Sequence, residues 1–479
     1  MRFHATLTSC DFFVWGHVMP FDLYALMAER RAEKFDLFER CLNPQLVRVL
    51  RTLGFDTDYV RAQGPYLFDA DDNRYLDLLS GFGVFALGRN HPTVIDALEQ
   101  VLRAQLAGLV QLDVSLLAGL LAERLLRQMP WLDRLFFCSS GAEAVEAAIK
   151  FARAATGRPK IVYCEHAFHG LTNGALSLCG DVTFRERFEP LLPDCVAVPF
   201  NDLEALDEVL ATEEVAAFFV EPIQGRGVNL PTHDYLPEAA RLCRRHGALF
   251  VADEIQTGLG RTGRFLASEH WGVEPDMVLL AKALSGGFVP VGAVAMQRGT
   301  FDKVFDRMDR AVVHGSTFSK NDLAMAAGLA TLTVLEEERL IERADALGQR
   351  LIAGLGARLG GHQFVRDVRG KGMMIAIEFG PPRSVRLNAA YTLMEQASKG
   401  LFCQLVLMPL FEHHRILTQV AGHGLPVIKL LPPLVLAEKD LEWIESAFDT
   451  VIRESESLGA VWHRGRVLAN HALKARLGT

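Results

Sequence analysis

The chain contains 479 residues, of which 50% are hydrophobic and 23% charged, and its formal net charge at pH 7 is −8. This length exceeds what one compact core usually holds, so we expect two or more domains. The composition is typical of globular proteins and excludes disordered and fibrous chains. The net negative charge argues against a nucleic-acid partner.

Residues 1–18 are predicted to form an extension outside the folded protein. They carry one early positive charge, Arg2, and Asp11 interrupts their apolar stretch, so they make a poor signal peptide. Met19 opens an amphipathic segment and is a candidate start of translation. No apolar run reaches the roughly 18–20 residues of a membrane span. The eight cysteines are scattered without a CxxC pair, which favours a reduced, cytoplasmic protein with no metal site.

The segment that follows, residues 20–55, has apolar positions at helical spacing. Two short apolar stretches at 66–68 and 75–79 then flank a turn, which predicts a β-hairpin. We assign residues 19–90 to an N-terminal segment that forms part of a small domain.

Between residues 95 and 300, short apolar runs alternate with helical stretches. Runs without polar alternation are typical of strands buried on both faces, as in a parallel sheet covered by helices. Ligands of such sheets bind at the carboxyl ends of the strands, and polar residues follow several of these runs. The large domain is therefore predicted over residues 91–335, with strands at 134–138, 160–164, 215–220, 248–252, 277–281 and 292–296.

After residue 325, a long helical stretch leads into a smaller α/β segment. Candidate strands lie at 373–378 and 427–430, and the residues from 437 onward are helical. We assign residues 336–479 to a C-terminal small domain that the N-terminal hairpin completes.

Two charged residues, Lys282 and Asp253, each follow an apolar run of the predicted sheet. Taken alone, Lys282 fits a solvated strand end and Asp253 fits a loop carboxylate or helix cap. However, a lysine held in an apolar site has a lowered pKa and becomes a nucleophilic amine. A pyridoxal phosphate (PLP) site needs such a lysine for the Schiff base and a carboxylate that keeps the ring nitrogen protonated.

Two further segments add weaker signals. After a strand that ends at Cys138, residues Ser140, Gly141 and Ala142 lead into a helix. This turn fits a phosphate cradle of free N–H groups, although a plain capped helix fits as well. Phe168 offers a flat face for stacking on a heteroaromatic ring, or is a core phenylalanine.

Together these features resemble the class-III PLP-dependent aminotransferases, of the ornithine, acetylornithine, 4-aminobutyrate and diamine group. The resemblance covers roughly residues 45–450 and rests on the motifs SSGAEAVEAAIKFAR, FHG, VEPIQG, LFVADEIQTGLGRTG, LLAKALSGGFVPVGA, HGSTFSKNDLA and VRGKGMMIAIEF. It implies an α/β structure of PLP-dependent transferase fold type I, like aspartate aminotransferase. This fold has a large domain with a mainly parallel sheet and a smaller α/β domain. It also implies a homodimer with its active sites at the subunit interface.

The resemblance implies a role for each matching residue. Lys282 would form the Schiff base and carry the proton, and Asp253 would pair with the pyridine nitrogen. The other cofactor contacts that it implies are the phosphate cradle of Ser140, Gly141 and Ala142, with Phe168, His169, Glu221 and Gln256 near the ring. Thr317 would reach the phosphate of the partner subunit's cofactor, and Phe82 would lie at the substrate entrance.

Two positions depart from the pattern of the ornithine-like enzymes. Those enzymes commonly carry a glutamate where this chain has Arg226, and an arginine where it has Lys429. In that group the acid pairs with the arginine and releases it for a substrate carboxylate, which two cations cannot do. Two like charges about 4 Å apart repel by roughly 4 kcal/mol at an effective dielectric near 20. Arg226 and Lys429 should therefore lie apart, pair with other carboxylates, or bracket a substrate carboxylate.

The resemblance favours an aminotransferase that passes an amine from a donor such as glutamate to an aldehyde or ketone. A class-III aminomutase and a non-catalytic PLP-fold protein are the alternatives. The apolar stretch FGVFAL fits core packing, or alternatively an extended acceptor. Other stretches resemble hopanoid side-chain aminotransferases, so a hopanoid side chain and a polyamine are candidates.

Overall fold

The computed structural model describes residues 21–110, 112–457, 459 and 464–468. The predictions for residues 1–18 and Met19 lie outside the described residues. The chain divides into two compact units at Asp56. In the first unit the predicted helical segment is confirmed, and its helices are α1 (Leu23–Arg30), α2 (Lys34–Cys41) and α3 (Pro44–Leu53). Asn43 caps α3 by accepting hydrogen bonds from two backbone N–H groups of its first turn.

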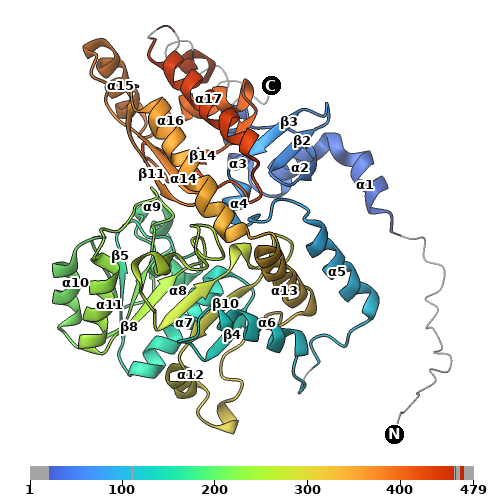
Figure 1. Cartoon of the computed structure of the whole chain (residues 1–479), viewed down its shortest axis with the longest axis vertical. Coiled ribbons are helices and arrows are strands. Elements are labelled where there is room, and N and C mark those ends of the chain that lie inside the picture. Colours follow the sequence, from blue (N-terminus) through green and yellow to red (C-terminus); the bar gives the residue numbers. More distant parts are fainter. Residues whose placement is uncertain (1–20, 111, 458, 460–463, 469–479) are drawn as a thin grey trace. The chain divides into compact units, whose positions relative to one another are not determined.

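The second unit contains three sheets (Figure 1). The predicted hairpin is confirmed as β2 (Tyr66–Asp69) and β3 (Arg74–Asp77), which pair antiparallel. β1 (Tyr59–Gln63) pairs with β2, and β13 (Ile416–Leu417) pairs parallel to β3, so the hairpin does join a strand from the C-terminal part of the chain. A second sheet has the order β11 (Val365–Lys371), β12 (Met374–Phe379), β15 (Val427–Leu430) and β14 (Gln419–Val420).

The largest sheet has seven strands in the order β4-β10-β9-β8-β7-β5-β6. Its strands are β4 (Arg134–Cys138), β5 (Lys160–Cys164), β6 (Cys195–Val198), β7 (Val215–Val220), β8 (Leu249–Asp253), β9 (Met277–Leu280) and β10 (Gly292–Met296). All six predicted strands are present. β6 was not predicted, and its side chains are mostly half-buried at the sheet edge.

The prediction of a mainly parallel sheet is confirmed, with β10 running antiparallel to both β4 and β9. The physical reason is the connection from β9, residues 281–291, which turns back without a helical crossover long enough to return the chain in the same direction. The sheet is therefore mainly parallel, with one reversed strand.

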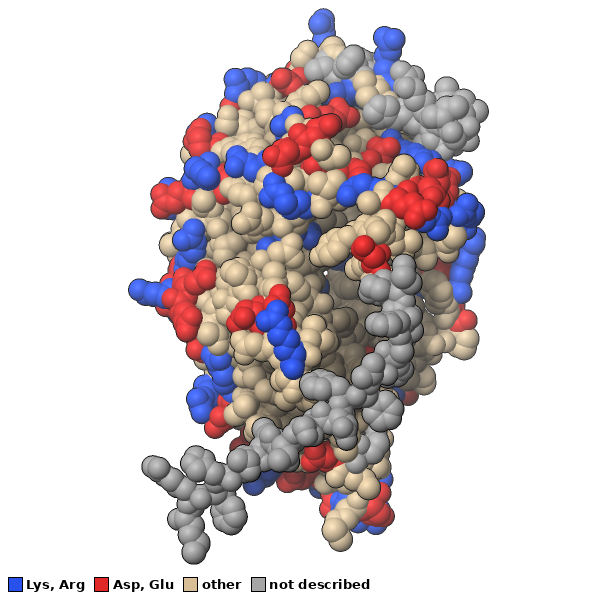
Figure 2. Space-filling view, turned by 90° about the vertical axis from the view of Figure 1, so that its right-hand side faces the viewer, with Lys and Arg blue, Asp and Glu red and all other residues tan. Residues whose placement is uncertain are grey.

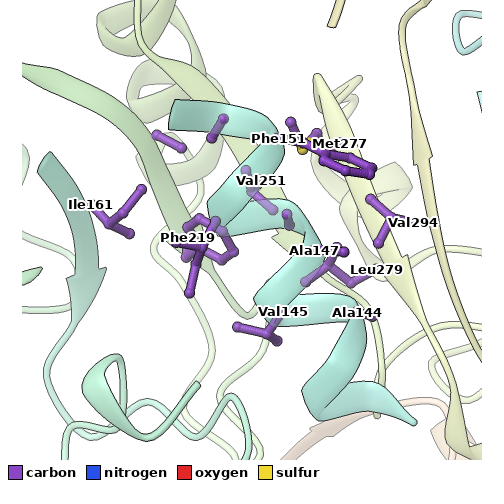
Figure 3. Close-up of a cluster of buried hydrophobic side chains, with 14 of the residues drawn as sticks. Ala144, Val145, Ala147, Phe151, Ile161, Phe219, Val251, Met277, Leu279 and Val294 are labelled. Atoms are coloured by element: carbon purple, nitrogen blue, oxygen red, sulfur yellow. The ribbon is translucent and has the colours of Figure 1, made fainter. Parts of the chain in front are cut away.

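Helices cover both faces of this sheet because the side chains of each strand alternate between two buried clusters. Residues 161 and 163 of β5 and residues 217 and 219 of β7 pack against α7 (Gly141–Thr156). Figure 3 shows part of this cluster, including Phe151, Phe219 and Val251. Residues 162, 164, 218 and 220 pack on the opposite face with side chains of α10 (Leu203–Leu210) and α11 (Tyr235–His246).

The remaining helices are α4 (Ser80–Gly83), α5 (Pro92–Ala104), α6 (Leu116–Arg127), α8 (Asn173–Ser177), α9 (Val182–Arg185), α12 (Arg298–Val304), α13 (Asp322–Glu337), α14 (Leu340–Leu359), α15 (Val385–Ala397), α16 (Leu401–Glu412) and α17 (Glu438–Ser455). Of these, α8 and α12 contribute Ala175 and Val304 to the cluster around α7. None of the helices in the described residues is long and apolar enough to cross a bilayer.

Charges of both signs are interspersed on the face that Figure 2 shows. Within the described residues, no group of three or more His, Cys, Asp or Glu side chains has an arrangement that could hold a metal ion.

Candidate active site

A cavity of about 460 Å³ lies at the carboxyl edge of the seven-stranded sheet. β4, β5, β7, β8 and β9 all run in one direction, so their carboxyl ends meet at this edge. The cavity collects residues that are far apart in the sequence. Those predicted from the sequence are Ser140, Gly141, Ala142, Phe168, His169, Glu221, Asp253, Gln256 and Lys282.

Lys282 lies two residues after the end of β9, at the start of a 3-10 turn, with a positive φ of 34°. An L-residue rarely adopts this backbone conformation, so the turn imposes a specific direction on the side chain. Burial lowers the pKa of Lys282, and the charges of Asp253 and Glu221 only partly oppose this shift. The amine is therefore closer to its neutral, nucleophilic form than a solvated lysine would be.

Asp253 ends β8 and is almost fully buried. Its Oδ1 accepts a hydrogen bond from Ile255 N at 3.0 Å, and its Oδ2 lies 2.6 Å from His169 Nδ1. Burial alone would lower the pKa of His169, but the hydrogen bond and charge of Asp253 outweigh it and raise the pKa. The imidazole is therefore held firmly against the buried Asp253 side chain.

Glu221 follows β7 and accepts hydrogen bonds from two loops at the sheet edge. Its Oε2 accepts a hydrogen bond from Phe168 N at 3.1 Å, and its Oε1 accepts one from Gly225 N at 2.8 Å. Burial raises the pKa of Glu221, although the charge of His169 and these two hydrogen bonds oppose the shift. The carboxylate thus fixes the backbone that carries Phe168.

Ser140, Gly141 and Ala142 begin α7 at the cavity. The Ser140 side chain caps the helix by accepting a hydrogen bond from Glu143 N. Helix geometry leaves the N–H groups of Gly141 and Ala142 without an intrahelical acceptor, and the helix dipole makes this end positive. Gly292 at the start of β10 packs against this turn, because a Cβ atom there would lie 2.3 Å from Ser140 O. The turn is therefore held rigidly in place.

These residues fit PLP by their chemistry. The cavity offers an amine for an aldehyde, a buried carboxylate for a ring nitrogen, an aromatic face and a helix N-terminus for a phosphate. In addition, His169 Nε2 is buried and has no hydrogen-bond partner among the described residues. A polar atom in this state requires a partner that the protein itself does not supply.

Lys429 lies outside the residues that line the cavity but reaches one of them, Gln256. Its Nζ donates to Gly225 O at 2.7 Å and to Gln256 Oε1 at 3.4 Å. The residue is only 4% exposed, so its side chain does not point to solvent. Burial, followed by the charge of Lys282, lowers the pKa of Lys429 to about 7.

Gln256 also contacts Phe82, because Gln256 Nε2 donates a hydrogen bond to Phe82 O at 3.1 Å. The Phe82 side chain is 52% exposed, and its φ of 62° is in the left-handed region. Lys429 donates to the Gln256 side-chain oxygen and the Phe82 carbonyl accepts from its nitrogen, so these two neighbours orient the Gln256 amide.

Arg226 forms an ion pair with Asp181, the residue that caps α9. Three arrangements were expected for the two cations. Arg226 therefore shows the second of them, an ion pair with another carboxylate. Asp181 was not identified from the sequence, because nothing in the local pattern distinguishes it from an ordinary helix cap.

Thr317 is exposed and does not line the cavity of its own chain. Its neighbour Ser316 does approach the site, with Ser316 Oγ lying 3.1 Å from Ser139 Oγ. Other lining residues were also missed, namely Val84, Ser139, Gly170, Ile255, Thr257, Ala281, Ser285, Gly287, Phe288, Val289, Pro290 and Val291. Several of them lie in the segment that follows Lys282. Its position directly after a strand end could have predicted that it lines the site.

Comparison with known proteins gives one consistent family. The sequence model described as aminotransferase class-III matches residues 51–452. The chain is 39% identical to an ornithine aminotransferase of Bacillus cereus, over 80% of this chain and 91% of that protein. It is 35% identical to aminotransferase PigE of a Serratia species, over 88% of this chain, and spans 54% of the length of PigE.

Solved structures agree with this result. An ornithine aminotransferase of Toxoplasma gondii, described with partial occupancy of PLP at its active site, matches with a TM-score of 0.76 and 31% identity. The match covers 90% of this chain and 99% of that one. Class-III aminotransferases use PLP and have fold type I, in agreement with the mainly parallel sheet and the residues at its carboxyl edge. The chain therefore belongs to the class-III aminotransferases, and PLP is its cofactor.

Proposed function

We propose that this aminotransferase moves an amino group from a donor such as glutamate to the terminal aldehyde or ketone of an extended, largely apolar acceptor. The observation that carries the proposal is the apolar character of the cavity beside Lys282, which is lined by Val84, Ile255, Phe288, Val289, Pro290 and Val291. A hydrocarbon body gains free energy on leaving water for such surroundings. A hopanoid side chain is the apolar candidate for such an acceptor, and a polyamine is the more polar one.

In this proposal each residue has one task at the cofactor. When bound, PLP supplies an electron sink for the reacting carbon. Lys282 supplies the amine that binds the cofactor and moves a proton at that carbon, and Asp253 keeps a proton on the ring nitrogen. Phe168 faces the ring, and the N–H groups of Gly141 and Ala142 bind the phosphate with Ser140. His169 and Glu221 hold this frame in place through their contacts with Asp253 and Phe168.

Lys429 and Gln256 are assigned to the substrate side of the same site. Lys429 has no carboxylate partner among the described residues, whereas Arg226 is paired with Asp181. Lys429 is thus the cation that remains for a donor carboxylate. Gln256 links it to the entrance at Phe82.

Class-III aminotransferases are generally dimeric, and we propose a homodimer in which Thr317 of each chain reaches the partner's cofactor phosphate. Large apolar side chains are exposed in two segments near the site. They are Leu102, Leu106, Leu109, Val110, Leu112, Val114, Leu116 and Leu120 in the first segment, and Met308, Val312, Val313 and Phe318 in the second. Exposed large apolar side chains that are concentrated in two segments in this way suit a subunit interface.

A screen of donors and acceptors tests the proposed reaction. Purified holoenzyme should form 2-oxoglutarate from glutamate when an apolar terminal aldehyde is present, and the rate should rise as the alkyl chain is lengthened. A short, charged aldehyde should be a poor acceptor. Isomerisation of an amino compound without any added donor or acceptor would instead show an aminomutase.

Lys282 should be the residue that carries the cofactor. Borohydride should fix PLP on the peptide that contains Lys282, as determined by mass spectrometry of a digest. Lys282→Ala should reduce turnover by at least about 10³-fold, because nucleophile and proton carrier are lost together. The exposed residue Lys439 is the matched control, and Lys439→Ala should retain both label and activity. A label on any other lysine would overturn the assignment.

The dimer can be tested with two inactive variants. Lys282→Ala and Thr317→Val homodimers should each be impaired, because each lacks one component at both sites. Mixed dimers should regain activity in one of their two sites if Thr317 acts across the interface. Mixtures that stay as inactive as their parents, in spite of demonstrated subunit exchange, would place Thr317 at its own chain's site or at none.

The buried position of Lys429 predicts a specific pH dependence of stability. Its pKa in the folded protein, about 7, lies below that of an unfolded lysine, so burying the amine costs free energy wherever the unfolded chain is protonated. This cost is fully present below about pH 7 and disappears as the pH approaches about 10.4. The difference in Tm between Lys429→Met and the wild type should therefore shift in favour of the wild type between these values.

The control for this measurement is Lys439→Met, whose side chain is exposed and whose Tm difference should not depend on pH in this way. A constant difference for Lys429→Met would contradict the buried amine. The same variant should raise the KM for glutamate more than that for a neutral amine donor, and equal changes would remove Lys429 from the substrate side.

A further inference from the structure

We propose that Arg226 is a positioning residue that fixes the ring of Phe168 over the cofactor site, and that Asp181 holds it in this role. Arg226 thereby ceases to be available as a ligand for a substrate carboxylate. This inference rests on the proposed function in one respect, namely that Phe168 faces the bound cofactor.

The ion pair between Arg226 and Asp181 is the first element of this arrangement. The two side chains are 11% and 13% exposed, so water screens their charges poorly. Burial alone would raise the pKa of Asp181, but hydrogen bonds from Thr183 and Arg226 outweigh it and lower the pKa. Asp181 is therefore ionised at neutral pH, and the charge of Arg226 is already neutralised before any substrate enters.

The second element is a path of aromatic contacts from this ion pair to the cavity. Arg226 Cζ lies 5.5 Å from the centroid of the Phe184 ring. The Phe184 ring in turn meets Phe168 at a centroid distance of 5.5 Å and an interplanar angle of 67°, an edge-to-face contact. Phe168 lines the cavity, and its backbone is held separately by Glu221. The ring of Phe168 is thus in contact with Phe184, and Phe184 with Arg226.

A third element restricts the guanidinium from the side of the C-terminal segment. Gly422 lies in the loop between β14 and β15, where a Cβ atom would be 2.9 Å from Arg226 Nε and 3.0 Å from Nη2. The backbone at Gly422 therefore leaves just enough room for the arginine in its observed position.

The alternative, a substrate-binding arginine, makes an opposite prediction for one substitution. If Arg226 bound a donor carboxylate, that carboxylate would have to displace Asp181. Asp181→Asn would then free the guanidinium and lower the KM for glutamate. If Arg226 positions Phe168, Asp181→Asn and Arg226→Met remove the same support and should have similar consequences for donors with and without a carboxylate.

The experiment compares holoenzymes of the wild type, Arg226→Met, Asp181→Asn and the double variant. The rate of PLP release after dilution and the circular dichroism of the bound cofactor's visible band report the site without turnover. Each single variant should release PLP about two- to tenfold faster, the range that loss of one aromatic contact corresponds to. The double variant should release it no faster than either single one, because both act through one contact path.

Kinetics and controls complete the comparison. KM for glutamate and for a neutral amine donor should change by the same factor in the two single variants, and Arg226→Lys should recover part of the loss. Arg245→Met breaks a solvent-exposed ion pair with Asp207 and should leave PLP release unchanged. If Arg226→Met does not fold, Phe184→Leu interrupts the same path without removing a charge, and it should accelerate release similarly.

Three results would overturn the inference. They are PLP release at the wild-type rate in Arg226→Met or Phe184→Leu, a lower glutamate KM in Asp181→Asn, and a KM increase in Arg226→Met restricted to donors with a carboxylate. A wild-type protein that binds PLP but fails in the donor and acceptor screen would contradict the proposed function alone.

Discussion

The common direction of β4, β5, β7, β8 and β9 is the constraint on which the rest of the structure depends. Parallel strands must be joined by crossovers, and their carboxyl ends therefore converge on one edge of the sheet. The residue that follows each strand is placed there regardless of its distance along the chain. Lys282, Asp253, Glu221 and the Ser140 turn meet for this reason.

Because these polar groups are buried, the free-energy cost of removing each from water must be offset by hydrogen bonds or opposite charges. Asp253 is supported by His169 and by a backbone N–H group, and Glu221 by two backbone N–H groups. Among the described residues, the charges of Asp253 and Glu221 only partly oppose the effect of burial on Lys282, and its pKa stays lowered. The low-polarity surroundings thus leave this amine closer to its neutral, nucleophilic form.

The charged residues assigned to the substrate side, Arg226 and Lys429, differ from those of the cofactor side in how their charges are compensated. The family's pair of acid and arginine is replaced by two cations, which cannot neutralise each other. The two cations have different partners. Arg226 pairs with Asp181, whereas Lys429 donates to Gly225 O and to Gln256. This pair therefore cannot act as a gate that opens for a carboxylate, and in the proposed function the apolar residues around Lys282 recognise the acceptor.

Much of this architecture could be predicted from the sequence because buried strands appear as uninterrupted apolar runs. The bounds of β4, β5, β7, β10 and β15 were predicted to the residue, and the positions of Lys282 and Asp253 after their strands followed from the same pattern. The family resemblance supplied their tasks, which remain to be tested by experiment.

Other features depended on contacts that no local pattern records. The reversal of β10 arises from a connection without a crossover, although its apolar run looks like that of its parallel neighbours. The pairing of Arg226 with Asp181 joins two loops that follow different strands, and the burial of Lys429 results from the packing of β15 close to Gly225. The sequence by itself determined which residues are buried in strands and which polar groups end them, because burial and periodicity are local properties. Only the tertiary structure decided the direction of a strand and the partner of each charge, because these depend on which distant segments the fold brings within a few ångströms of one another.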